Sequence, residues 1–192
     1  MEYQYDKDQC DYYYIVFNKG WDGARVFVDS REGSGTLSVI SSFGNFGYTW
    51  NSIGQESFKD FLSHLGFDYF MGKTCPDYME FDGEKTVEKF LKEYDEIKNE
   101  EEENYNPEED YLREDLEQMS DERDESSFCW RFSNAELDEI FPEFYEDLEH
   151  SPSASATGFW QEVWPRILDV FAKEKEASKQ EPVLPLNEEK IA

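Results

Sequence analysis

Two histidines, His64 and His150, are the side chains best suited to proton transfer near neutral pH. His64 lies beside an apolar helical segment, which predicts a structural role with a satisfied hydrogen bond. His150 precedes a run of small residues and is expected to be solvated. Neither belongs to a nucleophile motif. Cys129, between Phe128 and Trp130, is expected to be a small buried side chain rather than a reactive thiolate. We therefore expect no catalytic residue and no enzyme activity.

Other ligand-binding patterns are incomplete. The carboxylates of residues 6–11 have the spacing of a calcium-binding loop. The segment lacks the glycine and the final glutamate of a calcium-binding EF-hand. Residues 33–35 form a glycine-rich turn without the ending of a phosphate-binding loop. Cys10, Cys75 and Cys129 are too widely spaced for a zinc site or a disulfide framework. We expect no metal and no cofactor. A metal-dependent hydrolase remains an alternative, because paired carboxylates can hold metal ions, but 46 acidic residues produce close pairs by chance and such pairs are not specific for it.

Carboxylates are the dominant chemical groups of the sequence. The chain has 192 residues, with 46 Asp and Glu against 18 Lys and Arg, and a net charge of −28. Residues 77–149 hold 29 of the acids and only 7 of the bases, so this segment carries −22. Its flanks are nearly balanced. Because holding like charges together costs stability, the local excess favours a functional role.

The density of charge in this segment resembles that of nucleic acid. One acid per ~2.5 residues corresponds to one carboxylate per ~3.8 Å along a helix axis. Two adjacent helices would present one carboxylate per ~1.9 Å, close to the ~1.7 Å of axis per phosphate charge in duplex DNA. The segment is therefore predicted to bind a basic nucleic-acid-binding protein. Tyr94, Tyr105, Tyr111 and Tyr145 are candidate anchors. The predicted partner-binding residues are Glu93, Asp95, Glu96, Glu100, Glu101, Glu102, Glu103, Glu108, Glu109, Asp110, Glu114, Asp115, Glu117, Asp121 and Glu122.

Two other interpretations stay open. The acidic helices could be a solvated surface that only keeps the protein soluble. The protein could also be an adaptor that binds another protein through an aromatic surface around Trp160 and Trp164, although these rings fit a core equally well. Direct binding to nucleic acid or to an anionic membrane is not expected, because both would repel this chain.

The elements that position these residues begin with four short β-branched or aromatic runs. Short turns separate them, which predicts a four-stranded antiparallel meander. Apolar spacing over residues 58–65 predicts a helix that covers one face, and a second short helix is expected over 68–73. The four runs are residues 12–17, 24–29, 36–41 and 46–50.

The rest of the chain is predicted to be mostly helical, which makes the fold class α+β. Expected features are a helix over 86–99, a helix restarting at Pro107, and a helix capped by Ser133 and interrupted at Pro142. A linker over 151–156 and an apolar helix over 159–171, with a bend at Pro165, are expected to follow. The predicted organisation is a sheet with its covering helix (1–76), an acidic helical region packed on it (77–149), a C-terminal helix (150–172) and a flexible tail (173–192), together one globular unit.

The location of the protein follows from two absences in the sequence. No apolar run approaches the ~18 residues of a membrane span. Residues 1–6 also lack the basic and then apolar order of a signal peptide. A cytoplasmic protein is therefore expected.

Residues 35–90 contain a pattern made of Ser41 to Trp50, Gly54, Phe58 to Leu62, Asp68 to Lys73 and Phe81 to Gly83. This segment resembles a recurrent pattern in small uncharacterised bacteriophage and prophage proteins. The family supplies a phage setting and no activity. The acidic excess is similar in kind to that of phage-encoded DNA mimics that inhibit restriction and CRISPR systems. The phage setting therefore favours a non-enzymatic inhibitor of a host defence complex, acting in the cytoplasm of the infected bacterium.

Overall fold

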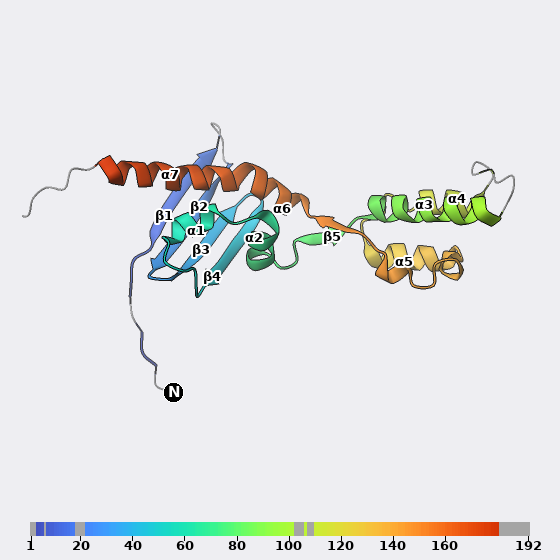
Figure 1. Cartoon of the computed structure of the whole chain (residues 1–192), viewed down its shortest axis with the longest axis horizontal. Helices are drawn as coiled ribbons and strands as arrows, with labels where there is room; N and C mark the ends of the chain where they lie inside the picture. Colours follow the sequence, from blue (N-terminus) through green and yellow to red (C-terminus); the bar gives the residue numbers. More distant parts are fainter. Residues whose placement is uncertain (1–2, 6, 18–21, 102–105, 107–109, 181–192) are drawn as a thin grey trace, which may run out of the picture. The chain divides into compact units, whose positions relative to one another are not determined.

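The computed structural model describes residues 3–5, 7–17, 22–101, 106 and 110–180. The chain forms two compact units (Figure 1). Unit 1 contains Met1–Pro76 and Ala154–Ala192, and unit 2 contains Asp77–Ser153. The sequence analysis treats the chain as one globular unit, whereas the chain leaves unit 1 after Pro76 and returns to it at Ala154. The packing of the acidic region on the sheet stays a prediction.

Unit 1 is built on the predicted four-stranded antiparallel meander, with strand order β1-β2-β3-β4. The register places Val26 of β2 opposite Val39 of β3, and Val39 opposite Phe46 of β4. Gly33 has a φ of +70° in the tight β2–β3 turn, a conformation that favours glycine. The strands are β1 (Asp11–Phe17), β2 (Asp22–Arg31), β3 (Ser34–Ser41) and β4 (Gly44–Trp50).

One face of this sheet is buried. Its side chains alternate with exposed ones along β2 and β3, as expected for an antiparallel sheet covered on one side. The helices α1 (Phe58–Ser63), α2 (Phe67–Thr74) and α7 (Trp164–Gln180) belong to the same unit. Phe58 packs so closely on Gly35 that a Cβ there would lie 2.3 Å from its ring. The predicted covering helix is therefore confirmed, and the C-terminal helix contributes to the same core through the ring pair Tyr13–Phe171.

The C-terminal helix contains a wide turn where Pro165 was expected to bend it. The helix α6 (Ala154–Gly158) leads into a π-helical turn, η4 (Phe159–Val163), and then into α7. The N–H of Trp164 donates to the carbonyl of Phe159, five residues earlier. A proline ring clashes with the carbonyl four residues before it in a regular helix, and the wider turn relieves that clash. The predicted fraying from Lys173 is wrong, because α7 continues to Gln180; residues 181–192 lie outside the described part.

Unit 2 is closed by a short two-stranded pairing that the sequence analysis did not predict. Strand β5 (Met79–Phe81) pairs antiparallel with β6 (His150–Pro152), and the N–H of Ser153 donates to the carbonyl of Tyr78. The predicted linker over 151–156 is therefore wrong. Between the strands lie α3 (Gly83–Glu101), α4 (Tyr111–Glu117), α5 (Glu125–Asn134) and the 3-10 turns η2 (Leu137–Glu139) and η3 (Phe144–Glu146).

The core of unit 2 consists largely of aromatic rings. Phe132 is fully buried, with ring centroids of Phe90 and Phe144 at 5.0 and 4.4 Å. Thr86, also fully buried, accepts a hydrogen bond of 2.9 Å from the N–H of Glu149. Large rings bury much apolar surface per residue, which allows a small and highly charged unit to fold.

One predicted helix start in unit 2 is wrong. Ser133 lies in the last turn of α5, whose N-cap is Asp124, because Phe128 and Phe132 bury the face that fixes this helix. The chain then turns through Glu136, which adopts a left-handed conformation. Pro107, where a helix was expected to restart, lies outside the described residues, and α4 begins at Tyr111, capped by Asp110.

Candidate acidic interface

The fifteen predicted partner-binding acids are all the acidic residues between positions 93 and 122. This stretch contains only two bases, Lys98 and Arg113, so its net charge is −13. It covers the C-terminal half of α3, the helix α4 and the turn that follows α4. Glu101 is the last residue of α3. Glu102, Glu103, Glu108 and Glu109 lie outside the described residues, as does Tyr105.

Arg113 joins α3 and α4. Its Nε donates to Asp95 Oδ1 at 2.9 Å, and its Nη1 pairs with Glu117. The hydrogen bond to Asp95 raises the pKa of Arg113 above its ordinary value. Asp110 caps α4 by accepting from the N–H groups of Leu112 and Arg113, and it also accepts from the Tyr94 hydroxyl at 2.9 Å. These acids therefore hold the two helices together.

The end of α4 is fixed against the start of α3. A Cβ at Gly83 would lie 2.4 Å from the carbonyl oxygen of Glu122, so the two backbones approach too closely for any other residue. The Glu122 carboxylate accepts from Arg131 of α5 at 2.7 Å. Four predicted interface residues, Asp95, Asp110, Glu117 and Glu122, thus have structural partners inside the unit.

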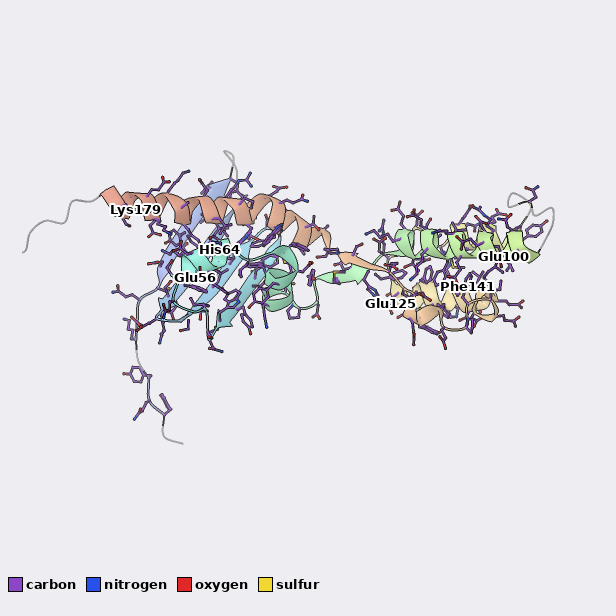
Figure 2. All side chains as sticks on the ribbon, viewed as in Figure 1. Glu56, His64, Glu100, Glu125, Phe141 and Lys179 are labelled. Carbon is purple, nitrogen blue, oxygen red and sulfur yellow. The ribbon has the colours of Figure 1, made fainter. Side chains whose placement is uncertain are left out.

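Six other predicted residues are exposed and form no ion pair among the described residues. Three of them stand at i, i+3 and i+7 on α3 and therefore share one side of the helix. Along this stripe the carboxylates recur about every 5 Å of helix axis. This spacing is wider than that expected from the sequence, because Asp95 is bound to Arg113 and is not part of the stripe. Glu100 lies near the C-terminal end of α3 (Figure 2). The six are Glu93, Glu96, Glu100, Glu114, Asp115 and Asp121.

The N-terminal half of α3 differs in charge from this acidic stripe. Lys89 binds the carboxylates of Asp147 and Glu149 at 2.8 and 3.1 Å. Asp82 accepts from Ser151 at 2.5 Å, which lowers the pKa of Asp82. These contacts fasten the start of α3 to β6 and its neighbours, so Lys89 is used in the structure of the unit.

Exposed aromatic side chains accompany the acids. Tyr111 and Tyr145 are 82% and 62% exposed, as an anchoring role requires, whereas Tyr94 is fully buried. The sequence analysis missed Trp130, which is 70% exposed. The sequence contained a signal for this exposure. Phe128 and Phe132 are both buried and lie on one side of the helix, so Trp130, halfway between them, lies on the opposite side.

The Trp160 and Trp164 surface proposed for an adaptor is largely part of the core. Trp164 is 2% exposed and Trp160 is half-buried. Their ring centroids are 5.8 Å apart, and that of Phe70 lies 4.4 Å from the Trp164 ring. Unit 1 instead exposes Tyr12, Tyr14, Val16 and Ile40, which share the uncovered face of the sheet.

The candidate proton carriers do not form a catalytic arrangement. The predicted hydrogen bond of His64 is present, with Nδ1 3.2 Å from Glu56 Oε2, although the side chain is 72% exposed. His150 is exposed, with Nε2 at 3.1 Å from Glu125. Burial raises the pKa of Cys129, which opposes thiolate formation. Within the described residues, no group of three or more His, Cys, Asp and Glu side chains could hold a metal ion. Asp6 lies outside them.

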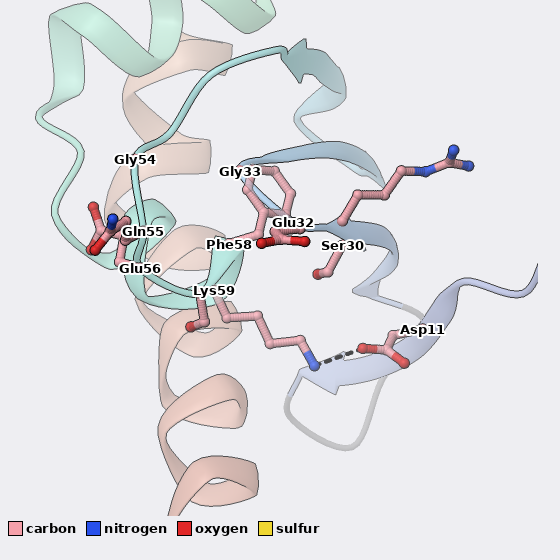
Figure 3. A pocket seen from close by; sticks show the side chains of 11 residues that line it. Asp11, Ser30, Glu32, Gly33, Gly54, Gln55, Glu56, Phe58 and Lys59 are labelled. Carbon is pink, nitrogen blue, oxygen red and sulfur yellow. Dashed lines mark hydrogen bonds and ion pairs between the residues drawn. The ribbon is translucent and has the colours of Figure 1, made fainter.

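A cavity of about 970 Å³ in unit 1 is spanned by an ion pair (Figure 3). Lys59 donates to Asp11 at 2.7 Å and also to Glu174 and Tyr13. Burial alone would lower the pKa of Lys59, but these hydrogen bonds raise it well above its ordinary value. A nucleophilic lysine needs the opposite shift, so Lys59 acts as a structural cation.

Comparison with known proteins places the chain in a phage family. A family model described as a phage family matches residues 3–173, which include parts of both units. The chain therefore belongs to this phage family, and the resemblance of residues 35–90 to bacteriophage proteins is confirmed. No curated protein and no solved structure matches. In the part of the chain that the structure describes, no helix has the length and apolar character needed to cross a membrane.

Proposed function

We propose that the protein is a non-enzymatic, phage-encoded inhibitor of a host defence complex of the restriction or CRISPR type. The acidic surface of unit 2 would occupy a basic DNA- or RNA-binding site of that complex. The observation that carries the proposal is the segregation of charge: one compact unit holds 29 acids and 7 bases, and six acids between Glu93 and Asp121 are exposed and form no ion pair among the described residues. Membership in a phage family supplies the setting.

The physical consequences of such a surface define how it would act. A dense array of anions raises the rate of association with a cationic cleft by long-range attraction, and salt weakens that attraction. Charge alone recognises many basic proteins. The exposed rings of Tyr111, Trp130 and Tyr145 would add the apolar contacts that give an interface its specificity. The binding partner is thus a basic protein of the infected cytoplasm, and neither nucleic acid nor a membrane is bound directly.

A matched pair of charge reversals tests the proposal. One variant carries Glu→Lys at Glu93, Glu96, Glu100 and Glu114 of unit 2. The control carries Lys at four exposed acids of unit 1, which changes the net charge by the same amount: Glu32, Asp68, Glu162 and Glu176. Both tagged proteins and the wild type are used to capture proteins from host lysate, and the captured proteins are eluted along a salt gradient and identified.

We expect the wild type and the control to retain a nucleic-acid-processing complex that elutes at moderate salt, and the unit 2 variant to lose it at least 100-fold. Equal losses in both variants would show that only net charge matters. A partner that elutes independently of salt and lacks a basic channel would contradict the proposal.

An adaptor function is the second candidate. It is favoured by the uncovered sheet face of unit 1, where Tyr12 and Tyr14 are 53% and 61% exposed. In that case acidity would serve solubility, and the unit 2 charge reversal would leave partner capture intact.

A further inference from the structure

The two edges of the sheet in unit 1 differ in how well they are protected against pairing with another strand. β1 and β4 form these edges, and no further strand in the described part of the chain pairs with either. β4 contains Gly44, Asn45 and Gly47, which are poor strand residues. The Lys73 ammonium also lies 5.4 Å from the ring centroid of Tyr48 on this strand. Charges and glycines of this kind discourage edge-to-edge association.

The β1 edge lacks glycines, and its nearby lysine, Lys59, lies over Tyr13 on the covered face of the sheet. Asp11 is followed by six uncharged residues, Tyr12 to Phe17, without proline, glycine or lysine. Tyr12, Tyr14 and Val16 are each more than half exposed. The one charge in the strand, Asp11, is bound to Lys59 at 2.7 Å. A protein with a net charge of −28 thus presents an aromatic strand edge whose single charged side chain is ion-paired.

We propose that β1 pairs antiparallel with β1 of a second copy, which joins two four-stranded sheets into one continuous sheet about a twofold axis. A register centred on Tyr14 places Tyr14 opposite Tyr14 of the second copy and Tyr12 opposite Val16. Asp11 then faces Phe17, so no like charges are opposed. The strand is self-complementary in this register, as a symmetric dimer requires. This inference does not depend on the proposed function.

Charge favours a second copy over the basic partner proposed for unit 2. A basic protein would gain nothing from an edge whose only carboxylate is already paired with Lys59. Aromatic and β-branched residues directly opposite one another stabilise antiparallel strands, and this edge supplies them on both sides of the axis. The net charges of two chains repel, so salt should strengthen the dimer, whereas salt weakens the binding of unit 2 to a cationic cleft.

Sedimentation and light scattering of the full chain test this pairing, with two variants of equal charge. Tyr14→Lys places two lysines opposite each other on the axis. Ile40→Lys adds the same charge to the same sheet face, but on the interior strand β3, where Ile40 is 44% exposed. The wild type and Ile40→Lys should move from 22.8 kDa toward twice that mass as concentration rises, and more readily at high salt. Tyr14→Lys should require about tenfold higher concentration or more.

A mixture of Tyr14→Lys and Tyr14→Glu chains separates lost pairing from misfolding. Each variant alone should remain monomeric, and an equal mixture should form a heterodimer, because Lys and Glu then face each other on the axis. A wild type that keeps the monomer mass at all concentrations and salt levels would overturn the proposal. Loss of the dimer in Ile40→Lys, or no rescue in the mixture, would also overturn edge pairing.

Discussion

The two units differ in surface charge and in the side chains that form their cores. Unit 1 has 17 acidic and 11 basic residues and buries alternating aliphatic side chains of a sheet such as Val26, Leu37 and Val39. Unit 2 has 29 acids and 7 bases and buries a cluster of phenylalanines. The difference shows that acidity is not a general property of this chain. It belongs to one compact unit, whose aromatic core offsets the repulsion at its surface.

The units also use their bases differently. In unit 1, Lys59 and Lys175 link α1 to α7 through Glu174 and Asp60. In unit 2, Lys89, Arg113 and Arg131 bind acids at the joints between elements. These three bases bind acids other than Glu93, Glu96 and Glu100, and the stripe forms no ion pair among the described residues.

The largest expected effect comes from removing core rings or side chains. Phe132→Ala should destabilise unit 2 by about 3–5 kcal/mol, because it leaves a cavity among Phe90, Phe128 and Phe144. Leu37→Ala should destabilise unit 1 by about 2–5 kcal/mol. Amide hydrogen exchange measures both: the first variant should lose protection in α3 and α5, and the second in β2 and β3. Loss across both units in either variant would show that they unfold together, against the comparison drawn here.

A smaller effect is expected at the Lys59 network of unit 1. Lys59→Met should cost about 1–2 kcal/mol near neutral pH, because it leaves two carboxylates side by side. The hydrogen bond from Lys59 lowers the pKa of Glu174 below its ordinary value, so this stabilisation is present above pH 4.5 and is lost as the pH falls through the lowered value. Unfolding at a series of pH values should therefore show the wild type and the variant converging below about pH 4.5. A constant difference down to pH 2 would contradict this account.

The smallest expected effect is that of salt on the free energy of unfolding, and it should differ between the two units. Screening the like charges of unit 2 should stabilise it by about 1 kcal/mol between low and moderate salt, while unit 1 changes little. Hydrogen exchange at two salt concentrations resolves the units separately. Destabilisation of unit 2 by salt would mean that its ion pairs, such as Arg113 with Asp95, outweigh the repulsion among its free acids.

The sequence predicted the elements whose signals are local. The four strands are short β-branched or aromatic runs separated by turn residues, and the stripe around Phe58 and Leu62 identified the covering helix. The return of the chain at β6 was missed, because the pairing of His150–Pro152 with Met79–Phe81 joins residues about seventy positions apart and its small residues resemble a linker. The start of α5 was missed because Ser133 imitates a helix cap, whereas Asp124 provides it.

The candidate interface was predicted by composition but not in its detail. Local charge located the stretch from Glu93 to Glu122, yet composition does not distinguish a free acid from one that binds an arginine. Asp95 is paired with Arg113 because α4 packs beside α3, a tertiary contact that composition does not show. Glu117 is paired with the same arginine within α4, four residues along the helix. Trp130 was overlooked because its apolar neighbours suggested a buried position.

Competition with nucleic acid tests the central claim most directly. The captured host protein is purified, loaded with labelled duplex DNA or RNA, and titrated with the wild type and with the two charge-reversal variants at several salt concentrations. We predict that the wild type and the unit 1 control displace the nucleic acid, with affinity falling as salt rises, and that the unit 2 variant does not. A stable ternary complex, or equal displacement by all three proteins, would contradict the claim that unit 2 occupies the nucleic-acid site.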